Sequence, residues 1–199
     1  MLQSAGTSSI IFPMTSRSES RNIIDHYHYW KHDAILADLD SKRHNYSVVC
    51  SNLHNDFNIS TVVRNANAFL AREVIIFGSK QWDRRGAVGT HNYNRMKYFK
   101  EDQFDELVSY MSGSRIVAVD NIGDAVDLSS YEWESDKHTF LIFGQEQVGV
   151  PEQLLRLATD VVYIPQYGTV RSLNVGTASG IVMYDYCSKM ILTNPISNV

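Results

Sequence analysis

The sequence predicts an α/β fold in which a mainly parallel sheet carries helices on both faces. Short runs of β-branched and aromatic residues alternate along the chain with stretches of helical periodicity. The runs are apolar at consecutive positions, which is typical of strands that are buried on both faces. Their alternation with helices favours parallel pairing, because parallel strands need a long crossover between them.

Each expected element follows from its own residues. Clusters of β-branched and aromatic residues predict strands at 46–50, 74–77, 116–119, 140–143 and 161–164. Isoleucine, valine and alanine at helical spacing predict a helix over about 58–70. Pro151 is expected to open another helix, since its missing N–H is not needed there. In a last helix, over about 174–190, the small residues near Gly176 and Gly180 predict close packing against a neighbouring backbone.

The chain has 199 residues, which fits one domain. Residues 1–20 lack the long apolar core of a secretory signal, so we expect a flexible polar tail there. One or two amphipathic helices are expected in an N-terminal extension at 21–45, ahead of a main domain at 46–193.

Composition excludes several classes of protein. Hydrophobic residues make up 44% of the chain, and no apolar run approaches the roughly 20 residues that span a bilayer, so we expect a soluble protein without a membrane partner. Cys50 and Cys187 lie far apart and the histidines are scattered, so we expect no metal site and reduced thiols in a cytoplasmic protein. The net charge of −4 gives the whole molecule no general attraction for phosphate.

One local stretch, 80–100, is nevertheless basic. Its cations and aromatic residues alternate, and the set comprises Lys80, Arg84, Arg85, Arg95, Lys97 and Lys100 with Trp82, Tyr93, Tyr98 and Phe99. Cations that bind phosphate beside rings that stack on bases suit single-stranded RNA. The alternative, which the stretch taken alone favours, is a solvated loop whose aromatic residues are anchored in the core.

Glycine and polar residues follow the expected strands, at Gly78, Asp120, Gly144 and Pro165. Open parallel sheets bind ligands beyond the carboxyl ends of their strands, so we expect these positions to converge on one site. No Gly-x-Gly-x-x-Gly or Gly-Lys-Thr pattern occurs there, which argues against a Rossmann dinucleotide site and against a nucleotide-binding hydrolase.

Three ordered segments carry the strongest signal. They are Asn-Ile-Ser-Thr-Val-Val-Arg at 58–64, Phe-Gly-Gln-Glu followed by Gly149, and Ile-Pro at 164–165 followed by Arg-Ser-Leu-Asn-Val at 171–175. In order, spacing and context they resemble the motifs of the SpoU/TrmH family of RNA ribose methyltransferases, in the SPOUT superfamily. The resemblance covers about 58–189 and implies that 46–193 is a SPOUT methyltransferase domain with a C-terminal trefoil knot.

The resemblance also implies an activity, which is methylation of a ribose 2′-hydroxyl in tRNA or rRNA by S-adenosylmethionine, carried out by a homodimer. It places Arg64 at the catalytic centre with Asn58, Glu146 and Asn174. It assigns the methyl-donor pocket to Val119, Gly144, Ile164, Ser172 and Leu173. By themselves these residues leave other roles open: a helix-surface ion pair for Arg64, an N-cap for Asn58, a helix cap for Ser172 and a loop contact for Asn174.

Guanidinium remains protonated up to a pH of about 12, so we expect Arg64 to act first as a phosphate clamp and electrostatic stabiliser, and as a general base only second. Relatives dimerise through the last helix, and we expect Met183 and Tyr186 to be exposed there. The chain departs from many relatives at Leu70, Gln166 and Gly176, where they carry Gly, Met and Ser. The main alternative is a non-catalytic RNA-binding or assembly factor that retains the fold.

Overall fold

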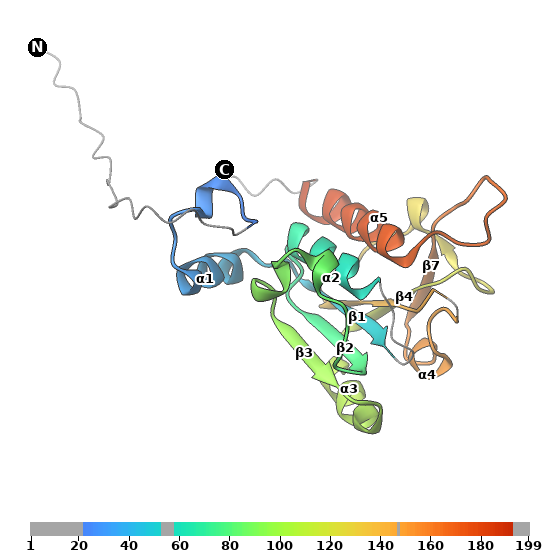
Figure 1. Ribbon diagram of the computed structural model, residues 1–199. Helices are drawn as coiled ribbons and strands as arrows, with labels where there is room; N and C mark the ends of the chain where they lie inside the picture. Colours follow the sequence, from blue (N-terminus) through green and yellow to red (C-terminus); the bar gives the residue numbers. More distant parts are fainter. Residues whose placement is uncertain (1–21, 53–57, 147, 193–199) are drawn as a thin grey trace, which may run out of the picture.

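A computed structural model describes residues 22–52, 58–146 and 148–192, so the tail expected at 1–20 lies outside the described residues. Within these ranges a single sheet has the strand order β3-β2-β1-β6-β4-β7-β5, and all pairs of neighbouring strands are parallel (Figure 1). The strands are β1 (Tyr46–Asn52), β2 (Val74–Gly78), β3 (Met96–Phe99), β4 (Arg115–Val119), β5 (Val126–Asp127), β6 (Thr139–Phe143) and β7 (Asp160–Tyr163). The predicted α/β class with a mainly parallel sheet is confirmed.

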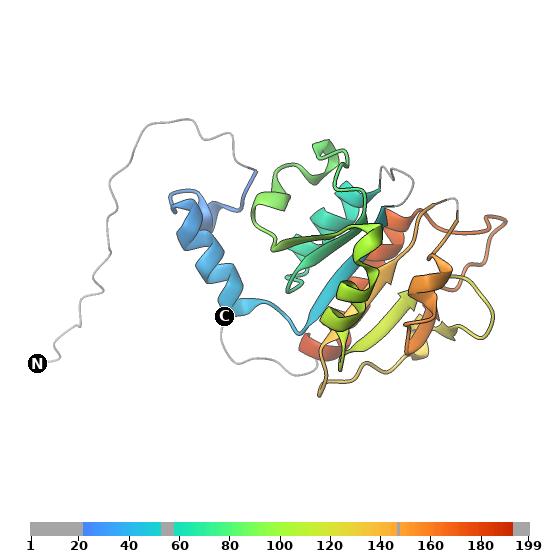
Figure 2. The ribbon, with the colours of Figure 1, turned by 90° about the horizontal axis from the view of Figure 1, so that it is seen from below.

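Helices cover both faces of the sheet (Figures 1 and 2). One apolar layer lies under α2 (Ile59–Ala68) and α5 (Val175–Cys187), and the other lies under α3 (Phe104–Met111) and α4 (Glu152–Leu155). Successive side chains of a strand enter opposite layers, as Val48 and Val49 of β1 do. This two-sided burial explains why the strands read as continuous apolar runs.

The helices α2 and α5 pack closely, as the small residues of α5 predicted. A Cβ atom added to Gly176 would lie 2.8 Å from the Thr61 Cβ, and one added to Gly180 would lie 3.2 Å from the Asn65 Nδ2. Asn65 Nδ2 also donates a hydrogen bond to the Gly176 carbonyl at 2.8 Å. The start of α5 is therefore fixed against α2, and this contact positions the segment that precedes α5.

The expected exposure of Met183 and Tyr186 is wrong. These side chains are 0% and 3% exposed and belong to the core under α2 and α5. Helical periodicity instead turns Thr177, Ile181 and Tyr184 to the surface of α5.

The N-terminal extension contains a 3₁₀ turn, η1 (Asp25–Tyr27), and α1 (His32–Lys42), which pack with Tyr93 in a small apolar cluster. The remaining short elements are η2 (Arg85–Ala87), η3 (Thr90–Asn92), η4 (Glu101–Gln103), η5 (Leu128–Ser130) and the π-helical turn η6 (Ser188–Leu192).

Several local features were not predicted, among them the helix α3 and the strands β3 and β5. The strand β3 lies within the basic stretch, for which a solvated loop was the alternative to an RNA-binding surface. It pairs with β2 from Val74↔Met96 to Phe77↔Phe99. Leu70, which follows α2, has a φ of 49°, in the left-handed region that favours glycine. This conformation gives a physical reason why relatives carry glycine at that position.

Candidate active site

The segment after β6 forms a tight loop that admits only glycine at its start. Gln145 N donates to the Gly149 carbonyl at 2.9 Å, and Gly149 N donates back to the Gln145 carbonyl at 2.8 Å. A Cβ atom on Gly144 would lie 2.1 Å from the Gly149 carbonyl carbon and 2.2 Å from Val150 N. Asp120, just beyond β4, accepts a hydrogen bond from Val150 N at 2.8 Å and ties the loop to the neighbouring strand.

A cavity of about 350 Å³ opens beside this loop, at the carboxyl ends of β4, β6 and β7. All of the residues predicted for the methyl-donor pocket line it, namely Val119, Gly144, Ile164, Ser172 and Leu173. We call it the donor cavity. Gln145 also lines it and is 6% exposed, and among the described residues neither atom of its side-chain amide has a hydrogen-bond partner.

Asn58, Glu146 and Asn174 form one hydrogen-bonded cluster, although they are far apart in sequence. Asn174 Nδ2 donates to Asn58 Oδ1 at 2.7 Å and to Glu146 Oε1 at 3.3 Å, while Asn58 Nδ2 donates to Glu146 Oε2 at 3.1 Å. Glu146 belongs to the lining of the donor cavity. We call this group the amide–carboxylate cluster.

The helix ends explain how the cluster is positioned. Asn58 occupies the N-cap position of α2, but its side chain makes no capping hydrogen bond and turns to the cluster instead. At α5 the N-cap is Asn174, whose Oδ1 accepts from Thr177 N at 3.2 Å. The capping role considered for Ser172 is therefore wrong, because the helix begins three residues later, at Val175.

Arg64 lies on the exposed side of α2, about 9 Å further along the helix axis than Asn58. Among the described residues no hydrogen bond or ion pair holds its guanidinium, so the surface ion pair considered for it is not observed there. One turn earlier, Ser60 faces Gly86, where an added Cβ would meet the Ser60 Oγ at 2.3 Å. The turn that carries Arg84 and Arg85 therefore packs next to the helix face that presents Arg64.

The basic stretch divides into two parts. On the carboxyl side, Lys80 lies over the Tyr98 ring at 5.0 Å from its centroid, and Arg84 lies over the Trp82 ring at 5.7 Å. Arg85 pairs with its neighbour Asp83 at 2.6 Å.

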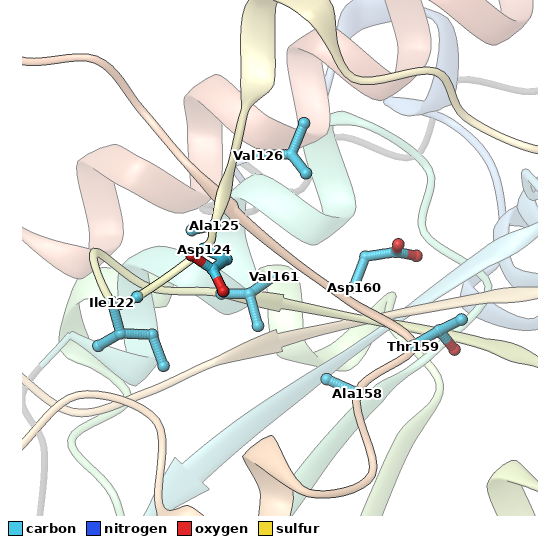
Figure 3. A pocket seen from close by; sticks show the side chains of 9 residues that line it. Ile122, Asp124, Ala125, Val126, Ala158, Thr159, Asp160 and Val161 are labelled. Carbon is cyan, nitrogen blue, oxygen red and sulfur yellow. The ribbon is translucent and has the colours of Figure 1, made fainter.

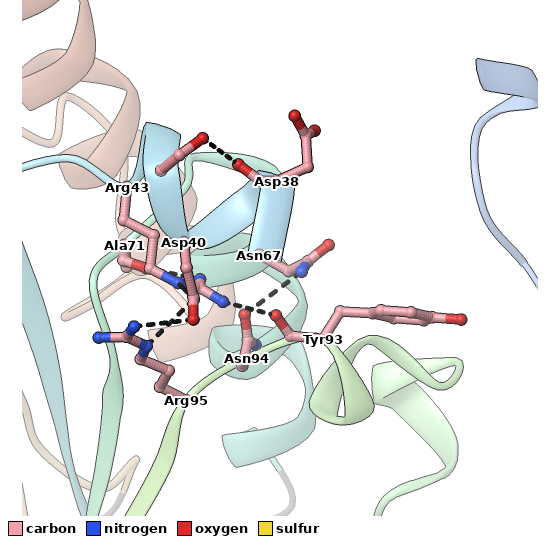
Figure 4. A network of polar contacts seen from close by, with 9 residues as sticks. Asp38, Asp40, Arg43, Asn67, Ala71, Tyr93, Asn94 and Arg95 are labelled. Carbon is pink, nitrogen blue, oxygen red and sulfur yellow. Dashed lines mark hydrogen bonds and ion pairs between the residues drawn. The ribbon is translucent and has the colours of Figure 1, made fainter. Parts of the chain in front are cut away.

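On the amino side of the sheet the cations of the stretch are neutralised. Arg95 pairs with Asp40 of α1 at 2.7 Å, and Asp40 also accepts from Arg43, whose other nitrogens reach the carbonyls of Ala71 and Tyr93 (Figure 4). Lys97 lies 3.5 Å from Glu73. This division could not be predicted, because the acidic partners Asp40 and Glu73 come from distant segments.

A different cavity, of about 310 Å³, lies between β7 and the segment that leads to β5 (Figure 3). Asp124 and Asp160 belong to its lining, and Arg115 pairs with Asp160 at 2.7 Å. It contains no residue of the three motifs, so it is not part of the candidate site.

The described residues contain no group of histidine, cysteine, aspartate or glutamate side chains that could hold a metal ion. In the same part of the chain, no helix is long and apolar enough to cross a membrane.

Comparison with known proteins gives a consistent result. The model of the SpoU rRNA Methylase family matches residues 45–184. A tRNA (guanosine(18)-2′-O)-methyltransferase from Escherichia coli K12 is 27% identical over 158 residues, which covers 76% of this chain and 67% of the relative. The corresponding enzyme from Aquifex aeolicus is 26% identical over 152 residues, which covers 74% of this chain and 71% of the relative.

Solved structures agree. The A. aeolicus TrmH/SpoU tRNA modifying enzyme matches with a TM-score of 0.67 at 25% identity, over 79% of this chain and 83% of that one. An AdoMet-bound rRNA methyltransferase from Sinorhizobium meliloti matches with a TM-score of 0.65 at 25% identity. The match covers 78% of this chain and 60% of that one. The chain therefore belongs to the SpoU rRNA methylase family, a family of S-adenosylmethionine-dependent RNA 2′-O-methyltransferases.

Proposed function

We propose that this chain methylates a ribose 2′-hydroxyl of RNA at the carboxyl edge of its sheet. The observation that carries the proposal is the amide–carboxylate cluster at the rim of the donor cavity, with Arg64 on the adjoining helix and unpaired among the described residues. A protein that kept the fold only to bind RNA has no need to hold two amides on one carboxylate beside such a cavity. This arrangement favours an enzyme over the non-catalytic RNA-binding or assembly factor.

The donor cavity fits S-adenosylmethionine. Its lining is apolar at Val119, Ile164 and Leu173, and Gly144 lets the loop close tightly at its edge. Among the described residues the buried amide of Gln145 has no hydrogen-bond partner, a deficit that costs about 1–3 kcal/mol and that a polar ligand can offset. We expect Val119, Gly144, Ile164, Ser172 and Leu173 to hold the donor, which when bound supplies a methyl group already activated by its sulfonium charge.

The chain's own residues must then hold the acceptor ribose and stabilise the charge that develops as its hydroxyl loses a proton. Asn58, Glu146 and Asn174 orient the ribose, because amide and carboxylate groups together can both donate to and accept from sugar hydroxyls. Arg64 binds a substrate phosphate and stabilises the forming alkoxide. It stays protonated in these roles, and a role as literal general base ranks second.

The RNA is proposed to be a tRNA or an rRNA. Curated relatives are named for methylating guanosine 18 of tRNA, and a solved neighbour is named an rRNA methyltransferase. Lys80 and Arg84, with the rings beneath them, are the cations of the basic stretch best placed to bind it, since Arg95 and Lys97 already contact carboxylates. Arg85 contributes to RNA binding by leaving its ion pair with Asp83 and binding a phosphate of the RNA instead.

We also propose that two copies associate through α5 and that the segment leading into α5 completes a trefoil knot, as the resemblance to the SpoU/TrmH family implies. Support for the dimer comes from the outer face of α5, where Ile181 is 38% and Tyr184 is 59% exposed. Light scattering after gel filtration should give the mass of a dimer, and Tyr184→Asp should reduce it to that of a monomer. A wild-type monomer would contradict this part of the proposal.

Methyl transfer provides the test of function. The purified protein is incubated with tritium-labelled S-adenosylmethionine and total RNA from cells that lack this activity, and the labelled nucleoside is identified after nuclease digestion. A 2′-O-methylated nucleoside is expected, and Glu146→Gln, which keeps the side-chain shape, should lose most of the signal. Donor binding without labelling of tRNA or rRNA would favour the binding factor, and label on a base would contradict the proposed chemistry.

A further inference from the structure

A second cavity, of about 500 Å³, adjoins the donor cavity on the β7 side of the sheet. The linings of the two cavities have in common Asn121, Ile122, Tyr163, Ile164 and Gln166. Val170 and Arg171, from the segment between β7 and α5, line the second cavity but not the first. We call it the outer cavity, and neither Val170 nor Arg171 has been assigned to the donor or to catalysis.

The outer cavity is suited to an anion. Arg171 is exposed, and in the described part of the chain no carboxylate or other acceptor contacts its guanidinium. The described lining contains no aspartate or glutamate, unlike the cavity of Figure 3 with Asp124 and Asp160. Asp124 follows the lining residue Gly123 but lies outside the described lining, so Arg171 is the charged side chain within it.

The carboxylates of the donor cavity do not neutralise this arginine. Asp120 accepts hydrogen bonds from the backbone N–H groups of Asn121 and Val150, at 2.7 Å and 2.8 Å. Glu146 is held by the amide groups of Asn58 and Asn174. Both carboxylates therefore have other partners, and Arg171 remains available to an external anion.

The backbone at Arg171 is anchored next to the reacting centre. Asn121 Nδ2 donates to the Arg171 carbonyl at 3.3 Å. The next residues, Ser172 and Leu173, line the donor cavity, and Asn174 belongs to the amide–carboxylate cluster. An anion bound by Arg171 would thus lie beside the acceptor ribose and not at a remote surface.

The same segment also presents an aromatic ring to solvent. It extends beyond the body of the molecule between β7 and α5 (Figure 1), and Tyr167 within it is 97% exposed. A tyrosine side chain gains little from full exposure to water, because its ring is mostly apolar. An exposed ring beside an unpaired arginine is the combination that binds unstacked bases and backbone phosphates of RNA.

We propose that Arg171 and Tyr167 form a second RNA contact, in which Arg171 binds a backbone phosphate beside the acceptor nucleotide and Tyr167 stacks on an unpaired base. The inference rests on the proposed function and extends it. In the strand order, β2 and β7 lie on opposite sides of β1 and β6, whose ends carry the amide–carboxylate cluster. An RNA strand that contacts Lys80 and Arg84 near β2 and Arg171 near β7 therefore crosses the cluster between them.

RNA binding by the full chain tests the proposal. Affinity for a tRNA transcript is measured over a range of salt concentrations for wild type, Arg171→Ala and Arg171→Lys. The matched control is Arg72→Ala, an exposed arginine at the opposite, amino end of β2. We expect Arg171→Ala to weaken binding about tenfold at low salt and to lower the salt dependence by about one phosphate contact, with Arg171→Lys close to wild type and Arg72→Ala unchanged.

Tyr167 gives an independent variant pair. Loss of a stacked ring costs about 1–3 kcal/mol per base, so Tyr167→Ala should weaken binding about tenfold, whereas Tyr167→Phe keeps the ring and should bind normally. Affinity for S-adenosylhomocysteine, measured by calorimetry, and the molecular mass should be unchanged in all of these variants.

Several results would overturn the inference. Weaker S-adenosylhomocysteine binding by Arg171→Ala with unchanged RNA affinity would assign Arg171 to the carboxylate of the donor. A fall in molecular mass would assign the segment to contacts between copies, and unchanged RNA affinity in both alanine variants would exclude the contact. If wild type binds RNA through these residues but transfers no methyl group, the proposed function fails while this contact stands.

Discussion

Arginine side chains near the two edges of the sheet differ in whether they form ion pairs within the chain. At the amino edge Arg115 contacts Glu134, Asp160 and the Tyr131 hydroxyl, and its side chain is only 14% exposed. At the carboxyl edge Arg64 and Arg171 are exposed and have no ion pair with the described residues. Cations that the chain neutralises internally stabilise the fold, whereas unpaired cations around a cavity remain available for an anionic substrate.

The largest expected effect is on catalysis by Arg64. Arg64→Ala should lower the turnover number about 10²–10³-fold, because it removes a preorganised charge from the transition state. The melting temperature should not change, since the side chain is exposed and unpaired among the described residues. Single-turnover methyl transfer at saturating donor and RNA measures the effect, and near-normal turnover would remove Arg64 from the catalytic centre.

The opposite behaviour is expected of Arg115. Arg115→Ala should lower the free energy of unfolding by about 1–3 kcal/mol, because it leaves the partly buried Asp160 carboxylate and the buried Tyr131 hydroxyl without their donor. Methyl transfer at a permissive temperature should persist. The matched control is Arg156→Ala, which breaks a pair with Glu152 whose side chains are 75% and 78% exposed, and urea unfolding should detect less than about 1 kcal/mol there.

Gly144→Ala should affect both stability and ligand binding. The added Cβ would lie within 2.2 Å of the Gly149 and Val150 backbone, so the loop must shift, at about 1–3 kcal/mol. S-adenosylhomocysteine binding, followed by calorimetry, should be strongly weakened. Gly168→Ala is the control, because nothing lies within 4 Å of its Cβ position, and equal affinities for the two variants would argue against the assigned donor cavity.

A pH dependence of stability is also expected at the amino edge. Burial, aided by the Arg72 cation, lowers the pKa of His138 from 6.5 to about 4. As the pH falls, His138 therefore binds a proton in the unfolded chain before it does so in the folded chain. The contribution of His138 to the free energy of unfolding is complete above pH 6.5 and is lost as the pH falls toward 4. Urea unfolding from pH 7 to 4 should show a smaller loss for His138→Gln than for wild type, and parallel curves would contradict this assignment.

Much of the fold could be predicted because its signals are local. Continuous apolar runs identified the major strands, and the rule that parallel strand ends converge brought Asp120 and Gly144, which both line the donor cavity, to one expected site. The amide–carboxylate cluster was expected from the motifs, but its hydrogen bonds depend on how α2 and α5 begin, which only the packed structure shows.

The errors concern partners that are distant in the chain. The short edge strand β3 was missed because its charged and aromatic residues also suit a loop, and only pairing with β2 distinguishes them. Arg95 and Lys97 look like RNA ligands until Asp40 and Glu73 are placed beside them. Met183 was expected on the outer face of α5, because periodicity alone does not say which stripe of an apolar helix meets the sheet.

A crystal structure with S-adenosylhomocysteine tests the central claim most directly, because it locates the donor without assuming turnover. The account predicts that the ligand occupies the donor cavity, in contact with the Gly144 loop and Leu173, while Asn58, Glu146 and Asn174 remain hydrogen-bonded at its rim. Ligand bound elsewhere, for example in the cavity of Figure 3, would contradict the assignment of the carboxyl edge as the active site.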